Sequence, residues 1–234
     1  MRKSLQPNRA LLAPLAFVLA AVSCIMSSSC NKNRGLVTLS ASDSLAIVMD
    51  NIAHRAEVDS FFRHDEGSPF RRDTSITFHG INWYQIDPHF SVKSMLHHFA
   101  TPETVAVMGT KGEMRRELKY GYFEFTIPDI HGVPTTLRLN VYKFTPYDGD
   151  RYILFKDNLS VWFRDRTTGT ETYDVGRYVD VGVESEDPQH EYTLDFNKSY
   201  NPYCAYSSLY SCAVPRKEDF LDIHLRVGER KYHD

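Results

Sequence analysis

The stretch DFNKSYNPYCAYSSLYSC, residues 195–212, holds four tyrosines and two cysteines within eighteen positions. A second dense stretch, FRDRTTGTETYDVGRY, precedes it at residues 163–178. The pair Asn201-Pro202 favours a turn inside the first stretch. We expect residues 195–212, called the tyrosine segment below, to form an ordered strap that closes a body of β-strands. The arginine and the aspartates that precede it are expected to hold it in place.

Apolar and polar residues alternate along several short runs of the chain. A period of two is typical of strands with one buried and one wetter face, as in antiparallel sheets. Such runs occupy residues 105–107, 122–127, 137–142 and 223–227, and residues 76–86 form a further expected extended run. Many short strands separated by turn residues predict a mainly β fold, an antiparallel sandwich or barrel. No second shift in composition appears, so we predict a single domain over residues 40–234.

A helix is expected before the strands. Ser40 and Asp43 have the spacing of a capping box, with Ser40 as the N-cap. The apolar residues that follow recur at spacings of three and four, which predicts an amphipathic helix that ends near Arg63. This apolar stripe is expected to pack on the domain, and binding of a partner is the alternative. The stripe consists of Leu45, Val48, Met49, Ile52 and Ala56.

Residues 1–29 have the pattern of a secretory signal, because basic residues lead an apolar run and small residues follow it. The apolar run is shorter than the ~20 residues that a membrane-spanning helix needs, which argues against a retained helix. Small residues before a cysteine resemble a bacterial lipoprotein signal. Cys30 is the predicted lipidation site because polar residues follow it, and Cys24 is the alternative. We therefore expect a lipid-anchored protein of the bacterial cell envelope that faces the periplasm, with residues 30–39 as its tether.

The charge of the mature chain excludes one class of partner. Removal of residues 1–29 takes away three positive charges and no negative one, so the formal net charge moves from −3 to −6. A mildly acidic chain lacks the basic patch that nucleic acid requires. The expected partners are the membrane, through the lipid anchor, and an unknown small molecule or envelope protein.

Cys204 and Cys212 are the cysteines of the predicted domain, residues 40–234. Export would place them in an oxidising compartment, where a disulfide closing this short loop contributes ~2–3 kcal/mol. The alternative is two buried thiols that act as small apolar groups. No Cys-x-x-Cys or local His-x-x-x-His pattern accompanies them, so no metal site and no cofactor are predicted.

The two dense stretches carry a family resemblance. They contain Phe163-Arg164-Asp165, Glu171-Thr172-Tyr173, Gly176-Arg177-Tyr178 and Tyr200-Asn201-Pro202-Tyr203-Cys204-Ala205-Tyr206, followed by Cys212, Pro215 and Gly228-Glu229. In this pattern the chain resembles the domain-of-unknown-function 1684 family of bacteria and archaea, whose members are often lipoproteins. The resemblance implies no activity, substrate or cofactor. The chain departs from the family pattern at two places. After Cys212, Ala213 and Val214 replace the usual proline and leucine, and Asp219 stands where asparagine is usual.

The polar residues of the two stretches form the candidate site. In one interpretation they surround a pocket, where Arg177 binds a carboxylate or phosphate, an aspartate accepts protons and tyrosines stack on a ring. In the other, Arg177 pairs with Asp165 or Asp195 and fixes the loop while the tyrosines fill the core. The candidate ligand-binding residues are Asp165, Thr172, Tyr173, Arg177, Asp195, Asn197, Tyr200, Asn201 and Tyr203.

Signatures of common enzyme classes do not occur in the sequence: it has no G-x-S-x-G, no G-x-x-x-x-G-K-[ST], no G-x-G-x-x-G and no H-E-x-x-H. We therefore predict a non-catalytic ligand-binding or interaction module. The alternative is a small-molecule enzyme, a hydrolase or a cofactor-dependent protein, with a pocket around Arg177, Asp165 and residues 200–206.

Overall fold

The computed structural model describes residues 35–233. The predicted signal segment and both candidate lipidation sites, Cys30 and Cys24, lie outside the described residues. The helices are α1 (Ala41–His64), α2 (Pro69–Arg72) and α3 (Asp150–Phe155). The strands are β1 (Ser91–Met108), β2 (Met114–Pro128), β3 (Pro134–Phe144), β4 (Asn158–Asp165), β5 (Arg177–Val183), β6 (Glu191–Asp195) and β7 (Phe220–Leu221).

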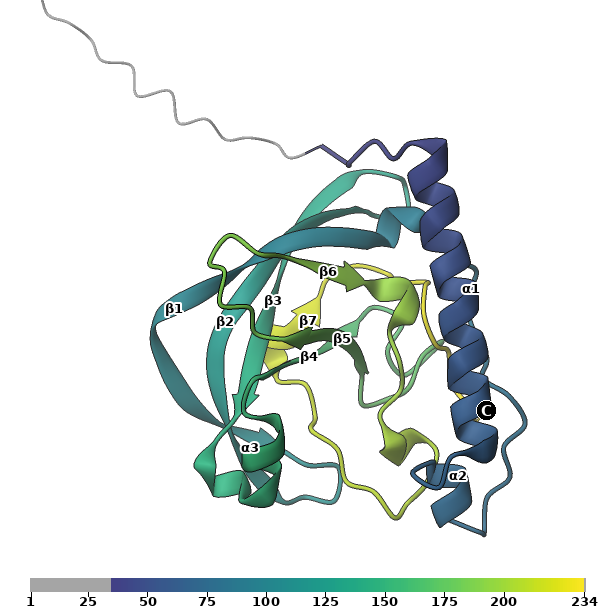
Figure 1. Ribbon diagram of the computed structural model, residues 1–234, viewed down its shortest axis with the longest axis vertical. Coiled ribbons are helices and arrows are strands. Elements are labelled where there is room, and N and C mark those ends of the chain that lie inside the picture. Colours follow the sequence, from purple (N-terminus) through teal and green to yellow (C-terminus); the bar gives the residue numbers. More distant parts are fainter. Residues whose placement is uncertain (1–34, 234) are drawn as a thin grey trace, which may run out of the picture. The chain divides into compact units, whose positions relative to one another are not determined.

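The strands form one sheet in the order β5-β4-β3-β2-β1-β6, and all neighbours in this order are antiparallel. The short β7 lies off this path and pairs parallel with β4. The sheet curves until its end strands β5 and β6 lie side by side, so it is nearly closed into a barrel (Figure 1). The prediction of a mainly β, antiparallel fold with an N-terminal helix is confirmed.

Alternation along the strands places the main core inside the curved sheet. Phe123, Phe125 and Ile127 are buried there, as their period-two spacing predicts. The pairing of β1 with β2 slips between His98 and Glu103, and the sheet bends at that point. Gly121 lies beside this irregularity, where a Cβ atom would come within 2.5 Å of the His97 carbonyl oxygen. Glycine therefore permits the close approach of the two strands.

A second, smaller core lies on the opposite face of the same sheet. Val161 and Phe163 of β4 belong to the main core, so Trp162 between them points the other way. Trp162 packs there with Tyr142 and with Ala213, a residue that follows the tyrosine segment. Both faces of this part of the sheet are thus covered.

Helix α1 begins as predicted, because the Ser40 side chain accepts a hydrogen bond from the Asp43 backbone nitrogen at 3.1 Å. The expectation that its apolar stripe packs on the domain is wrong. Leu45, Met49 and Ile52 are 61%, 57% and 50% exposed. The helix instead buries Asn51, which hydrogen-bonds to the body, and Phe62, which joins an aromatic cluster near its C-terminal end.

Two expected extended runs do not form strands. Residues 76–86 are irregular, with an isolated bridge between Trp83 and Glu229. Residues 223–227 keep their buried alternation but make no ladder, because the Leu225 and Val227 carbonyl oxygens accept hydrogen bonds from a buried arginine side chain instead. Among residues 35–233, no helix is long and apolar enough to cross a membrane.

Candidate functional site

Two cavities lie on either side of a wall formed by Tyr178, Tyr200, Ser211 and Cys212. The larger, called the aromatic cleft below, has a volume of about 620 Å³. The smaller, called the Glu117 cavity, has a volume of about 340 Å³. Both volumes fall in the range of about 300–1,000 Å³ that is usual for small-molecule sites.

The aromatic cleft lies between helix α1 and the tyrosine segment. Val58 and Phe61 of α1 line one side, and Tyr203 and Tyr210 line the other. The few polar side chains include Asn201, whose buried Oδ1 atom has no hydrogen-bond donor among the described residues. His54 also lines the cleft, and burial, followed by the nearby Lys198 charge, lowers the pKa of its imidazole. The cleft is therefore lined mainly by apolar and aromatic side chains, and its polar groups include an imidazole with a lowered pKa and the unpaired Asn201 Oδ1.

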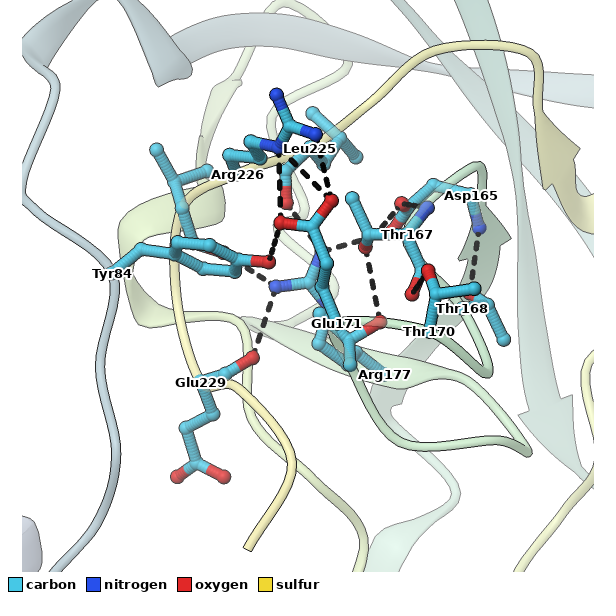
Figure 2. A network of polar contacts seen from close by, with 12 residues as sticks. Tyr84, Asp165, Thr167, Thr168, Thr170, Glu171, Arg177, Leu225, Arg226 and Glu229 are labelled. Carbon is cyan, nitrogen blue, oxygen red and sulfur yellow. Dashed lines mark hydrogen bonds and ion pairs between the residues drawn. The ribbon is translucent and has the colours of Figure 1, made fainter. Parts of the chain in front are cut away.

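Arg177, the central candidate from the sequence, lies at the start of β5 and is 1% exposed. Its Nη2 atom donates to Asp165 Oδ2 at 2.9 Å and to the Leu225 carbonyl oxygen at 2.8 Å. Nη1 donates to the carbonyl oxygens of Val227 and, at 3.2 Å, Glu229 (Figure 2). Of the two aspartates predicted from the sequence as partners for Arg177, Asp165 pairs with it and Asp195 does not. The guanidinium joins the end of β4 to residues 225–229, rather than to the tyrosine segment.

The other carboxylate oxygen of Asp165 is also occupied. The Thr167 backbone nitrogen and hydroxyl donate to Oδ1 at 2.6 and 2.5 Å, and Thr167 exchanges a hydrogen bond with the Thr172 hydroxyl at 3.0 Å. Figure 2 shows how these short contacts close the loop after β4 around Arg177. A buried charge with this many partners is characteristic of a structural centre.

Asp195 and Asn197 form a second structural centre at the end of β6. Asn51 of α1 donates to Asp195 Oδ2 at 2.7 Å, and the Asn197 backbone nitrogen donates to Oδ1 at 3.0 Å. The Asn197 side chain exchanges hydrogen bonds with the backbone of Asp87 at 2.8 and 2.9 Å. Asp195 therefore ties helix α1 to the sheet.

The nine candidate residues fall into separate groups. Tyr200, Asn201 and Tyr203 line the aromatic cleft. The Tyr173 hydroxyl donates to the Cys204 carbonyl oxygen at 3.3 Å. Neither cavity is lined by the remaining five, which belong to the two structural centres, and their role in ligand binding stays a prediction. These five are Asp165, Thr172, Arg177, Asp195 and Asn197.

Cys204 and Cys212 carry free thiols in this structure. The Cys204 backbone nitrogen donates to Cys212 Sγ at 3.3 Å. A hydrogen bond from the Cys212 thiol lowers the pKa of Cys204 to about 6, and the same contact raises the pKa of Cys212. The disulfide stays a prediction. Among residues 35–233, no group of three or more His, Cys, Asp or Glu side chains is arranged to hold a metal ion.

Glu229 is a buried carboxyl that was not among the candidate residues from the sequence. Its Oε2 atom accepts from the Tyr206 hydroxyl at 2.5 Å and from the Asn201 backbone nitrogen at 2.8 Å. Burial raises the pKa of Glu229 to about 7. The pair Gly228-Glu229 stood in the family pattern, which was the one signal in the sequence that pointed to this residue.

Sequence reasoning also missed Glu117 of β2, which lines the smaller cavity and is 1% exposed. Burial and the neighbouring Asp148 raise the pKa of Glu117 to about 7. Its carboxyl makes no hydrogen bond among the described residues, and its Oε2 atom is fully buried. The register of β2 shifts between Lys119 and Gly121, so simple alternation from Phe123 could not predict which way Glu117 points.

Comparison with known proteins gives a family but no activity. The family model described as "Protein of unknown function (DUF1684)" matches residues 76–230. An uncharacterized protein of Haloarcula marismortui, with a solution NMR structure, is 31% identical. The match covers 78% of this chain and 92% of that one, with a TM-score of 0.53. No curated protein matches the chain.

Proposed function

The chain belongs to the DUF1684 family of proteins of unknown function, and from that premise we propose that it is a non-catalytic ligand-binding module of the bacterial cell envelope. Its ligand is a small, largely apolar molecule that carries one hydrogen-bond donor. The membrane anchor is the lipidated Cys30, with Cys24 as the alternative.

The aromatic cleft is the observation that carries this proposal. Its volume of about 620 Å³ accommodates a small molecule, and its sides are formed by Val58, Phe61, Tyr203 and Tyr210. Aromatic faces favour a planar or ring-bearing ligand. The free Oδ1 atom of Asn201 fixes the orientation, because it lacks the donor that a buried acceptor requires.

The buried ion pair of Arg177 with Asp165 favours binding elsewhere over catalysis at this centre. An enzyme that used Arg177 and Asp165 would need these groups to face a substrate. The two side chains are instead 1% and 0% exposed and pair with each other. A guanidinium whose Nη atoms are held by four protein oxygens has no fork left for a carboxylate or phosphate.

Calorimetric titration with indole and with 1-methylindole tests the ligand class. Indole has an aromatic body and one N–H donor, and 1-methylindole lacks the donor. We expect indole to bind about tenfold more tightly, since the bond to Asn201 is lost in the methylated compound. Val58→Trp fills the cleft and should abolish binding, whereas Leu45→Trp on the exposed side of α1 should not. Equal affinity for the two compounds, or unchanged binding by the Val58→Trp variant, would contradict the proposal.

Cell fractionation tests the anchor. Cys30→Ala should move the protein from the membrane fraction to the soluble fraction, because the acyl chains that hold it are attached at that sulfur. Cys24→Ala is the matched control and should leave the protein in the membrane. A reversed result would assign lipidation to Cys24, and retention of the double variant Cys24→Ala/Cys30→Ala would contradict a lipid anchor at these cysteines.

A further inference from the structure

The Glu117 cavity lies on the outer face of the sheet, beside the smaller core. Strands β4 and β5 form its floor, α3 and the end of β3 border one side, and residues 211–213 border another. Phe144 and Phe155 give it an apolar wall. The cavity is separate from the aromatic cleft and touches it only through the shared wall.

Two buried polar groups in this cavity have no partner among the described residues. The indole Nε1–H of Trp162 finds no acceptor, and Glu117 Oε2 makes no hydrogen bond. Trp162 is 4% exposed and Glu117 is 1% exposed. An unsatisfied buried group costs about 1–3 kcal/mol, so two in one cavity favour a ligand that supplies their partners.

The Trp162 donor is held in a fixed orientation. Its ring stacks on Tyr142 with centroids 4.7 Å apart and an interplanar angle of 13°. The Tyr142 hydroxyl donates to Asp219 at 2.9 Å, and the Tyr178 ring lies against Trp162 with ring centroids 5.7 Å apart. The indole therefore cannot easily turn its N–H towards another acceptor.

One cation at the cavity is free of any ion pair. The Arg151 guanidinium of α3 lies 4.6 Å from the centre of the Phe144 ring and has no carboxylate within ion-pair distance among the described residues. Arg115, the other arginine that lines the cavity, is already engaged, because it donates to Glu113 at 2.7 Å and to the Ser211 carbonyl oxygen at 2.7 Å. Arg151 is thus the group available to balance a ligand charge.

We propose that the Glu117 cavity binds a small monocarboxylate with an apolar body, whose carboxylate accepts hydrogen bonds from Trp162 Nε1, from Arg151 and from the protonated carboxyl of Glu117. The apolar body lies against Phe144 and Phe155. Arg151 supplies one positive charge, and the Asp180 carboxylate also lines the cavity, so a monoanion is favoured over a phosphate dianion. An organic cation is disfavoured because Trp162 and Arg151 offer only donors.

Proton uptake is a direct consequence of this arrangement. The charged groups that face Glu117 are Arg115 on its own strand, Arg151 on α3 and Asp148 in the turn Pro146–Asp148, and Asp180 of β5 also lines the cavity. Ionised Glu117 would repel the ligand and would offer no donor. Binding therefore requires neutral Glu117, and above its pKa of about 7 the affinity should fall about tenfold for each pH unit.

Calorimetric titration of the full chain with benzoate, and with benzamide as its uncharged counterpart, tests the proposal. We expect benzoate to bind at about pH 6 and at least tenfold more tightly than benzamide, and to lose affinity towards about pH 8. The location is checked in a Trp83→Phe variant, where Trp162 is the remaining tryptophan. Benzoate should change its fluorescence.

Single substitutions assign the roles. Trp162→Phe removes one donor and Arg151→Gln removes the cation, so each should weaken benzoate binding about tenfold. Glu117→Gln keeps a donor at every pH, so binding should persist and lose its pH dependence. Arg71→Gln, on the exposed side of α2, is the matched control and should change nothing.

Three results would overturn the proposal. They are no benzoate binding at about pH 6, equal affinity for benzoate and benzamide, and an Arg151→Gln variant that binds as the parent does. Val58→Trp separates this site from the aromatic cleft, because it should abolish indole binding and leave benzoate binding intact. The two proposals can therefore fail independently.

Discussion

Arg177 and Glu117 are each 1% exposed, yet their surroundings are opposite. Arg177 has a carboxylate and three carbonyl oxygens as partners, and its network closes a loop. Glu117 has no hydrogen-bond partner among the described residues and lines a cavity. Burial alone therefore does not distinguish a structural charge from a functional one. The ionic and hydrogen-bond partners do, because both Nη atoms of Arg177 are engaged and only its buried Nε lacks an acceptor, whereas the whole carboxyl of Glu117 lacks a partner in the described part of the chain.

The largest change in unfolding free energy is expected at Arg177, the buried charge that has ionic and hydrogen-bond partners. Arg177→Met removes the cation and leaves Asp165 charged and buried without it. Breaking a buried pair in this way costs about 3–5 kcal/mol of unfolding free energy. Urea denaturation monitored by circular dichroism measures this loss. A cost below about 1 kcal/mol would show that Arg177 is not a structural centre.

The next effect is expected at Glu117, and it concerns how the unfolding free energy depends on pH. Folded Glu117 keeps its proton up to about pH 7, whereas the unfolded residue loses it near its usual pKa of about 4.3. The folded state therefore binds more protons between these values, and stability falls as the pH rises through them, by on the order of 3 kcal/mol. Glu117→Gln should remove this part of the slope from the plot of unfolding free energy against pH.

Glu229 contributes a slope of the same sign, since burial raises its pKa to about 7 as well. The difference between the parent and the Glu117→Gln variant isolates the Glu117 part. An identical slope in both proteins would mean that Glu117 is ionised in the folded state, and the contrast with Arg177 would be lost.

A smaller effect is expected at the carboxyl of Glu229. Tyr206→Phe removes the hydroxyl that donates to Oε2 at 2.5 Å and leaves a buried acceptor with one donor fewer. The expected cost is about 1–3 kcal/mol in thermal or chemical unfolding. Tyr210→Phe is the control, because the Tyr210 hydroxyl makes no hydrogen bond among residues 35–233. Equal effects of the two substitutions would assign the loss to packing.

The smallest effect is expected at the rim of the Arg177 network. Arg226 makes three hydrogen bonds to Glu171, at 2.8 and 3.0 Å, but its side chain is 55% exposed. Exposed pairs contribute about 0–1 kcal/mol, and salt screens them. Arg226→Ala should therefore leave the unfolding free energy nearly unchanged. A loss of unfolding free energy near that of Arg177→Met would show that an exposed ion pair stabilises the protein as much as a buried one.

Local signals in the sequence predicted part of this structure. The cap at Ser40, the strand around Phe123 and the pairing of Arg177 with Asp165 each depend on chemistry that is visible within a short segment or between charged residues. The exposed side of α1 was not predictable, because a buried polar contact from Asn51 to Asp195 decides which side faces the body. That contact joins residues 144 positions apart.

The candidate site was predicted less completely than the fold. Tyr200, Asn201 and Tyr203 do line a cavity, but the residues opposite them belong to α1, which is distant in sequence. Glu117 could not be found because the irregularity between Lys119 and Gly121 changes the alternation of β2. Polar residue types identify where charge is buried, and only the three-dimensional arrangement shows which charge lacks partners.

The position of the carbonyl oxygens that hold Arg177 has a consequence for biosynthesis. They belong to Leu225, Val227 and Glu229, which a ribosome adds about fifty residues after the arginine itself. A nascent chain that has reached only Val214 carries a guanidinium without these acceptors. Completion of the fold is thus delayed until residues 225–229 have been translated.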